Sequence, residues 1–192
     1  MVDFTPYAQR LPAAAVVETL DGLFSRFDDL AERYGVEKIK TIGDSYMVAA
    51  GVPTPRPDHA TALAHMALDM LDAMRGGDAG EAQLQLRVGI NSGPVIAGVI
   101  GRKRVAYDLW GDVVNTASRM ESAGTPGRIQ ITGATYELIK DEFVCERRGM
   151  VEVKGKGEME TWYLMSRRSS SDSRPAETAG AETVGAGSAA GT

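Results

Sequence analysis

The sequence contains a single cysteine, Cys145, and only two histidines, His59 and His65, among 192 residues. One cysteine excludes a disulfide within the chain and a metal site built from several thiolates. The histidines lie six residues apart near one predicted helix, a spacing that does not place both imidazoles on one helix face. We expect Cys145 to lie in a strand as a small apolar residue and each histidine to lie at the surface.

Long apolar runs and runs rich in lysine and arginine are also missing. No segment approaches the length needed to cross a membrane, and the first residues lack the charged and apolar regions of a signal peptide. The formal net charge of −5 argues against a protein that binds nucleic acid through its phosphates. We therefore expect a soluble, cytoplasmic protein with no membrane segment and no nucleic-acid partner.

What is present suffices for one ordinary domain, since 43% of the residues are apolar. We place this domain at residues 1–165. From residue 166 onward, small and polar residues replace the large apolar ones, so little remains to offset the entropy of ordering the chain. Residues 166–192 are therefore predicted to form a disordered tail.

Apolar periodicity and turn residues predict a mixed α/β fold with helices packed on a mostly antiparallel sheet. Helices are expected where apolar residues recur every three or four positions, and strands where they alternate. The predicted helices cover residues 12–35, a segment that follows residue 58, 112–123 and 134–140, and the predicted extended segments cover 36–51 (a hairpin), 84–90, 95–100, 128–132, 144–153 and 159–165.

Polar residues that could take part in catalysis or ligand binding gather in residues 106–120 (AYDLWGDVVNTASRM). Asp108 ends a predicted strand, and Gly111 and Asp112 are typical of a helix start. Asn115 and Arg119 are four residues apart, so they share one helix face. Such a pair is more often a solvated surface than a site, and this window alone therefore decides nothing.

A second window, residues 38–47 (KIKTIGDSYM), is predicted to form a β-hairpin. Two β-rich runs flank Gly43 and Asp44, a dipeptide that favours a two-residue turn. Asp44 would then lie at the hairpin tip. By itself, a carboxylate in that place is ordinary turn chemistry.

Together, the two windows resemble the catalytic domain of class III nucleotidyl cyclases, and within that family the homodimeric adenylate cyclases of mycobacterial type. The resemblance extends from residue 1 to about 165 and includes EKIKTIGDSYM (37–47), YDLWGDVVNTASRME (107–121) and VKGKG (153–157). It implies a ferredoxin-like βαββαβ core with a C-terminal extension. It also implies a phosphorus–oxygen lyase of signal transduction that converts ATP into 3′,5′-cyclic AMP and pyrophosphate.

The resemblance assigns roles to individual residues. Asp44 matches a ligand of the two divalent ions, Mg²⁺ or Mn²⁺, that such enzymes use. Arg119 matches the arginine that stabilises the transition state, and Asn115 the residue that orients the ribose. Lys154 or Lys156 corresponds to a lysine that contacts the polyphosphate, although a Lys-Gly-Lys turn alone is weak evidence.

Lys40 and Asp108 match the two positions with which the family reads the purine. A lysine ammonium can only donate hydrogen bonds and an ionised aspartate can only accept them. Adenine offers an acceptor at N1 and a donor at N6, whereas guanine offers the reverse. The pair therefore favours adenine and argues against a guanylyl cyclase, and the sequence also lacks the Gly-Gly-Asp-Glu-Phe signature of diguanylate enzymes.

Two further implications concern assembly and the start of the chain. In the family, the base, ribose and arginine residues of one subunit serve one site and its metal carboxylates serve the other, so activity requires a homodimer. The first metal aspartate of the family would fall immediately before Met1, which we therefore expect to be an internal methionine. Asp3 would point to the opposite strand face and is a poor substitute. The alternative function is a weak or inactive nucleotide-binding or dimerisation module.

Overall fold

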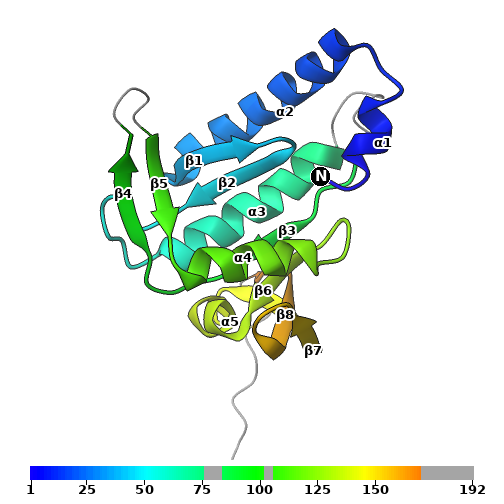
Figure 1. The fold of residues 1–192 in the computed structure, drawn as a ribbon. Coiled ribbons are helices and arrows are strands. Elements are labelled where there is room, and N and C mark those ends of the chain that lie inside the picture. The colour runs from blue at the N-terminus through cyan, green and yellow to red at the C-terminus, as the bar shows by residue number, and fades with distance from the viewer. Residues whose placement is uncertain (76–83, 102–105, 170–192) are drawn as a thin grey trace, which may run out of the picture.

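The longest described helices are α2 and α3; α3 runs through the centre of the molecule, and α2 runs along its upper edge (Figure 1). The computed structural model describes residues 1–75, 84–101 and 106–169. α2 spans Ala13–Tyr34 and ends at Gly35, whose φ of 59° is the left-handed conformation that commonly terminates a helix. α3 spans His59–Arg75. Both helices were predicted, and the observed bounds of α2 differ from the predicted ones by one residue at each end.

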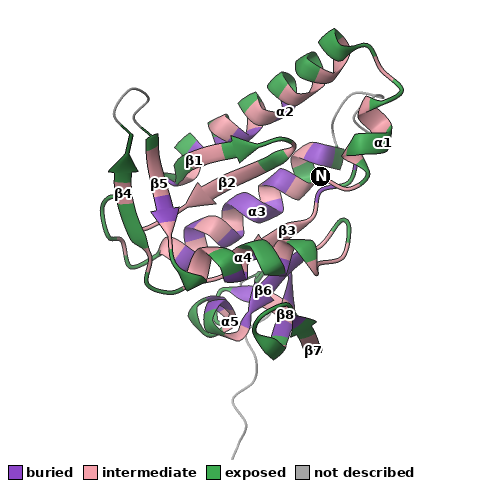
Figure 2. Ribbon diagram, in the orientation of Figure 1, coloured by how far each residue is buried: buried purple, intermediate pink, exposed green. Residues whose placement is uncertain are grey.

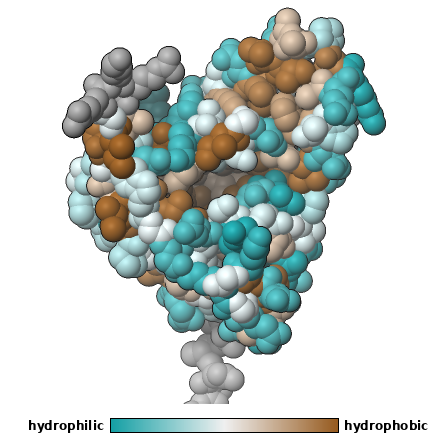
Figure 3. Space-filling model, in the orientation of Figure 1, coloured by the Kyte–Doolittle hydropathy of each residue, from teal (hydrophilic) through white to brown (hydrophobic). Residues whose placement is uncertain are grey.

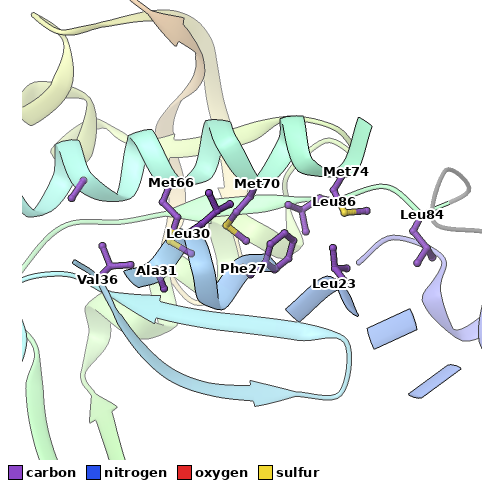
Figure 4. Packing of buried hydrophobic residues seen from close by; sticks show 11 residues of the cluster. Leu23, Phe27, Leu30, Ala31, Val36, Met66, Met70, Met74, Leu84 and Leu86 are labelled. Atoms are coloured by element: carbon purple, nitrogen blue, oxygen red, sulfur yellow. The ribbon is translucent and has the colours of Figure 1, made fainter. Parts of the chain in front are cut away.

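α3 is buried on two faces because it lies between two apolar clusters. On one face, Met66, Met70 and Met74 pack against Leu23 and Phe27 of α2 (Figure 4). The other face of α3 presents small residues to the larger sheet. The buried members of that second cluster are Ala60, Ala64, Ala67, Leu68, Ile90, Ile129, Ile131, Ile139, Phe143 and Leu164.

The strands of the described residues form three sheets. Two of these are antiparallel pairs, β1 (Glu37–Ile42) with β2 (Ser45–Ala49) and β4 (Ile96–Ile100) with β5 (Ala106–Trp110). The third has the order β3-β6-β8-β7, formed by Val88–Ile90, Ile129–Thr132, Gly157–Arg167 and Phe143–Val153. Only the β3–β6 pairing is parallel among the described strands. The predicted mixed α/β fold with mostly antiparallel strands is confirmed.

Three shorter helices complete the fold: α1 (Phe4–Ala8), α4 (Asp112–Ser122) and α5 (Gly133–Ile139). α4 crosses the molecule beside β3 and β6 (Figure 1). Gly89 of β3 allows this approach, because a Cβ atom there would lie 2.0 Å from the backbone nitrogen of Glu121. The position of α4 is therefore fixed by direct contact between backbones.

The segment before β3 is less regular than expected. The predicted strand over 84–90 is regular only at Val88–Ile90, and Gln85 makes a single antiparallel bridge to Val2. Asp3 then adopts a left-handed conformation, with φ of 54°, and the chain enters α1, so Val2 cannot extend this ladder. At the other end, β8 continues to Arg167, and residues 170–192 of the predicted tail lie outside the described part of the chain.

Burial is uneven across the molecule. Figure 2 shows buried residues concentrated in α3 and β6, whereas β4 is mostly exposed and β5 is mostly of intermediate burial. β4 carries large apolar side chains to the surface, since Ile96, Val99 and Ile100 are 69%, 62% and 62% exposed. Ile42, at the end of β1, is 61% exposed. We call the three β4 residues Ile96, Val99 and Ile100 the apolar edge, and the region of β4 shows hydrophobic colour in Figure 3.

Candidate active site

Lys40 and Asp108, which are distant in sequence, meet in the folded chain. Lys40 lies on β1 and Asp108 on β5, and the Lys40 Nζ atom donates to Asp108 Oδ2 over 2.5 Å. The other carboxylate oxygen, Oδ1, accepts from the backbone N–H of Leu109 over 2.8 Å. These two bonds, that of Lys40 first, lower the pKa of Asp108 below its ordinary value. At neutral pH, Asp108 is therefore an ionised acceptor beside a lysine donor.

Asn115 and Arg119 lie one turn apart on the exposed side of α4. α4 begins two residues after β5 because Gly111 breaks the strand with a φ of 130°. In Figure 3, the surface is hollowed between the β1–β2 hairpin and α4. The side chains of Asn115 and Arg119 have no hydrogen-bond or ion-pair partner among the described residues, so both are available to a ligand.

The start of α4 is held by a residue that sequence analysis did not select. The side-chain amide of Asn91, just after β3, donates to the backbone oxygen of Val113 over 3.0 Å. Its carbonyl oxygen accepts from the hydroxyl of Thr132, which is 2% exposed, over 2.8 Å. Asn91 thus ties α4 to β6. The polar dipeptide Asn91-Ser92 at the end of an apolar strand was the available signal in the sequence.

Lys154 and Lys156 lie in the turn between β7 and β8, and only one of them is engaged. The Lys156 ammonium donates to the carboxylate of Asp112, the first residue of α4. Lys154 is exposed and makes no ion pair or side-chain hydrogen bond with any described residue. The structure therefore brings the turn to the start of α4 and leaves one lysine free.

Asp44 lies at the β1–β2 turn, as predicted, and Gly43 precedes it with a φ of 59°. Its Oδ2 atom accepts from the N-terminal ammonium of Met1 over 2.6 Å, and its side chain is 29% exposed. Asp44 makes no hydrogen bond or ion pair with the other predicted site residues in the described part of the chain. Asp3 instead lines a separate hollow of about 260 Å³ with Pro6, Tyr7 and Arg10.

The sequence matches the family described as the adenylate and guanylate cyclase catalytic domain over residues 1–166. An adenylate cyclase of Mycobacterium tuberculosis is 51% identical over 188 residues, which cover 97% of this chain and 42% of that protein. The chain belongs to the class III nucleotidyl cyclase family. It spans less than half the length of the mycobacterial relatives that it matches.

Solved cyclase domains share the fold. The guanylate cyclase domain of RhGC from Catenaria anguillulae in complex with GTP has a TM-score of 0.84 at 40% identity, covering 87% of this chain and 92% of that chain. The adenylyl cyclase CyaB from P. aeruginosa has a TM-score of 0.81 at 31% identity, covering 87% and 90% respectively. The relatives of this class III cyclase domain thus include enzymes named for both purines, so family membership alone does not fix the base.

Class III cyclases generally use divalent metal ions, and the described residues match this requirement only in part. Asp44 supplies one carboxylate, the kind of ligand that Mg²⁺ and Mn²⁺ prefer. Among residues 1–75, 84–101 and 106–169, no group of three histidine, cysteine, aspartate or glutamate residues could hold a metal ion. Within the same residues, no helix is long and apolar enough to cross a membrane.

Proposed function

We propose that this cyclase domain converts ATP into 3′,5′-cyclic AMP and pyrophosphate in a homodimer. The observation that carries the proposal is the contact between Lys40 and Asp108, a donor and an acceptor held 2.5 Å apart at one place on the surface. Adenine needs a donor opposite N1 and an acceptor opposite N6, and this pair provides both. Guanine would face a donor with its own N1 donor and an acceptor with its O6 acceptor.

The pair must separate for a base to enter. In the structure, Lys40 and Asp108 satisfy each other, and their side chains are 40% and 22% exposed. An adenine edge replaces the direct bond with two bonds, one to each side chain. A mismatched base would break the bond and leave both charged groups without a suitable partner, which costs more than the loss of a neutral contact. The contact between Lys40 and Asp108 thus adds to the selectivity for adenine over guanine.

The reaction joins the ribose 3′-oxygen to the α-phosphorus and breaks the bond from that phosphorus to the β-phosphate bridge. The 3′-hydroxyl loses its proton, and pyrophosphate leaves. In the proposed site, Asn115 holds the ribose, and the Arg119 guanidinium neutralises charge that grows on the α-phosphate. Lys154 or Lys156 contacts the polyphosphate. A divalent ion at Asp44 would supply further charge neutralisation.

The homodimer proposal is supported by the apolar edge. Its isoleucine and valine side chains lie more than half exposed on β4. Exposed apolar side chains gathered on one strand are typical of protein interfaces. Contact with a second copy would cover them. In such a dimer, Asp44 of one subunit would serve the site that contains Arg119 of the other.

The test measures cyclic nucleotide formation by the purified domain with Mn²⁺, supplied with either ATP or GTP. We expect cyclic AMP to be the main product and the Arg119→Ala variant to be at least about a hundredfold slower. Arg75→Ala is the matched control, because Arg75 pairs with Asp72 on the surface of α3. A preference for GTP, or an Arg119→Ala variant as fast as the parent, would contradict the proposal.

A second candidate function is nucleotide binding without turnover. It is favoured by the absence, among the described residues, of a three-residue metal site. Calorimetry separates the two functions. Saturable binding of ATP without formation of cyclic AMP, whether Mg²⁺ or Mn²⁺ is supplied, would support the binding module. Formation of cyclic AMP would exclude it.

A further inference from the structure

We infer that Asp112 and Lys156 form a positioning pair that holds the β7–β8 turn, and with it Lys154, against the start of α4. The inference deepens the proposed function and rests on it. It concerns two residues that would not touch the substrate.

The first support is the place of the contact. Lys156 and Asp112 are 44 residues apart in the sequence, yet their charged groups are bonded. Asp112 is the first residue of α4, the helix that carries Asn115 and Arg119. A link at this point therefore fixes the turn relative to the residues proposed to hold ribose and α-phosphate. The carboxylate is also well placed electrostatically, because a negative charge is favourable at a helix N-terminus.

The second support is the difference between the two lysines. The β7–β8 turn is tightly built, since the Lys156 backbone nitrogen donates to the Val153 oxygen over 2.8 Å and Val153 pairs with Gly157. Val153 is 1% exposed, which anchors the turn in the core. Within this rigid turn, Lys156 is neutralised by Asp112, while Lys154 keeps an unpaired ammonium. Of these two lysines, Lys154 alone thus offers an uncompensated positive charge to a phosphate.

Fold stability does not account for the pair. The side chains of Lys156 and Asp112 are 31% and 71% exposed, and exposed ion pairs typically add little to the free energy of unfolding. The consequence of the Asp112–Lys156 pair is therefore expected in ligand binding rather than in the thermal midpoint of unfolding. If the pair is broken, the link between the turn and the start of α4 is lost, and the Lys154 ammonium is held less well where the phosphates bind.

The experiment compares the Kd values of ATP and adenosine by calorimetry for the domain as it stands, so that turnover is not required. Lys154→Met is expected to weaken ATP binding roughly tenfold, the loss typical of one charge-assisted hydrogen bond, without changing adenosine binding. Lys156→Met and Asp112→Asn should each weaken ATP binding about threefold or more. Neither should change adenosine binding. Lys140→Met is the matched control, because Lys140 forms an exposed pair with Glu137 on a different helix.

Two results distinguish the positioning pair from its rivals. If the pair acts through Lys154, the double variant Lys154→Met/Lys156→Met binds ATP no worse than Lys154→Met alone. If Lys156 bound phosphate directly, the two losses would multiply and Asp112→Asn would tighten ATP binding. If the pair were only a surface contact, Lys156→Met would match Lys140→Met. The inference is overturned if Lys156 binds phosphate directly or if Lys156→Met has the same effect as Lys140→Met. Absence of ATP and adenosine binding in the parent would instead contradict the proposed function.

Discussion

At the scale of single residues, the charges of Lys40 and Asp108 form the test of base choice. We predict that the double substitution Lys40→Glu and Asp108→Cys moves the preference of the domain from ATP toward GTP. Glutamate accepts from guanine N1–H and N2–H, and the uncharged thiol no longer repels guanine O6. The measurement is the ratio of kcat/KM for ATP to that for GTP in both proteins, and the total rate is expected to fall sharply.

Lys38 provides a control for this change, because it lies on the same strand and pairs with Asp28 instead. Lys38→Glu alters the charge of β1 by the same amount without touching the Lys40–Asp108 pair. Its ATP-to-GTP ratio should equal that of the parent. An unchanged ratio in the double variant would show that these two residues do not read the base.

His65 is a residue whose surroundings the sequence did not reveal. We expected a surface position, but the ring is partly buried against Phe143, 4.8 Å between centroids, and accepts a hydrogen bond from Arg167 Nε over 2.8 Å. An accepting Nδ1 atom requires a neutral ring. Burial, and after it the charge of Arg167, lowers the pKa of His65, although Glu142 and Asp69 act in the opposite direction.

This lowered pKa predicts how stability changes with pH. The unfolded chain, in which the histidine pKa is near 6.5, binds more protons than the folded chain as the pH falls through this region. Stability is therefore lost below about pH 6.5. We expect the thermal midpoint to drop between pH 7.5 and 5.5 by about a degree or two more in the parent than in His65→Phe, which keeps a ring but cannot titrate. Equal drops would contradict this account.

At the scale of elements, the contact between β3 and α4 predicts a strong effect of one methyl group. In Gly89→Ala, the new Cβ would lie 2.0 Å from Glu121 N and 2.7 Å from the backbone oxygen of Ala117. α4 must move away, so we expect a loss of about 1–3 kcal/mol in the free energy of unfolding. Cyclase activity should fall as well, because α4 carries Asn115 and Arg119. Urea unfolding and cyclic AMP formation measure the two effects.

Gly22 offers the matched control for this substitution. It lies inside α2, and a Cβ built on it meets nothing within 4 Å. Gly22→Ala should leave the unfolding free energy unchanged or raise it by up to about 1 kcal/mol, because alanine favours the helix. If Gly89→Ala behaved like Gly22→Ala, the backbone contact would not fix α4.

The same elements show which features a sequence can predict. α2 and the β1–β2 hairpin follow from local signals, namely apolar periodicity with a terminal glycine and a Gly-Asp turn, and both were predicted closely. β3 was predicted too long because a regular strand needs a continuous partner, and the described residues give the segment before Val88 only isolated backbone bonds, those of Gln85 to Val2 and of Leu86 to Gly127. The α1 helix was not predicted, since five residues carry too little pattern.

The candidate site could likewise be predicted only in part from the sequence. The family motif selected Lys40 and Asp108, and the fold brings them into contact, although they lie 68 residues apart. Asn91 was missed because its importance depends on hydrogen bonds to Val113 and Thr132, which belong to other elements. The pairing of Lys156 with Asp112 was likewise beyond sequence analysis. Residue types can indicate chemistry, but the partners of a side chain depend on the whole fold.

Three residues added before Met1 provide a test of the metal requirement. The Met1 nitrogen lies 2.6 Å from Asp44 Oδ2, so a residue attached to it comes within reach of that carboxylate. We predict that adding Phe-Ala-Asp before Met1 raises Mn²⁺-dependent cyclic AMP formation at least about tenfold, because two carboxylates hold divalent ions better than one. Adding Phe-Ala-Asn is the control. Equal rates for both additions would mean that the added carboxylate is not a ligand.

At the scale of the whole molecule, the proposed sharing of each site between two subunits leads to a prediction about two copies. If each site takes Asp44 from one subunit and Arg119 from the other, Asp44→Ala and Arg119→Ala proteins are each nearly inactive, yet a heterodimer of the two has one intact site. Random pairing of equal amounts makes about half of all dimers mixed, so we expect recovery of at most roughly a quarter of the parent rate. The mixture is best made in the Phe-Ala-Asp version, with subunit exchange verified by mass. A mixture of Asp44→Ala with Asp44→Asn, which cannot complement, sets the background. Exchange without recovery above that background would mean that each chain completes its own site, and the apolar edge would then need a different partner.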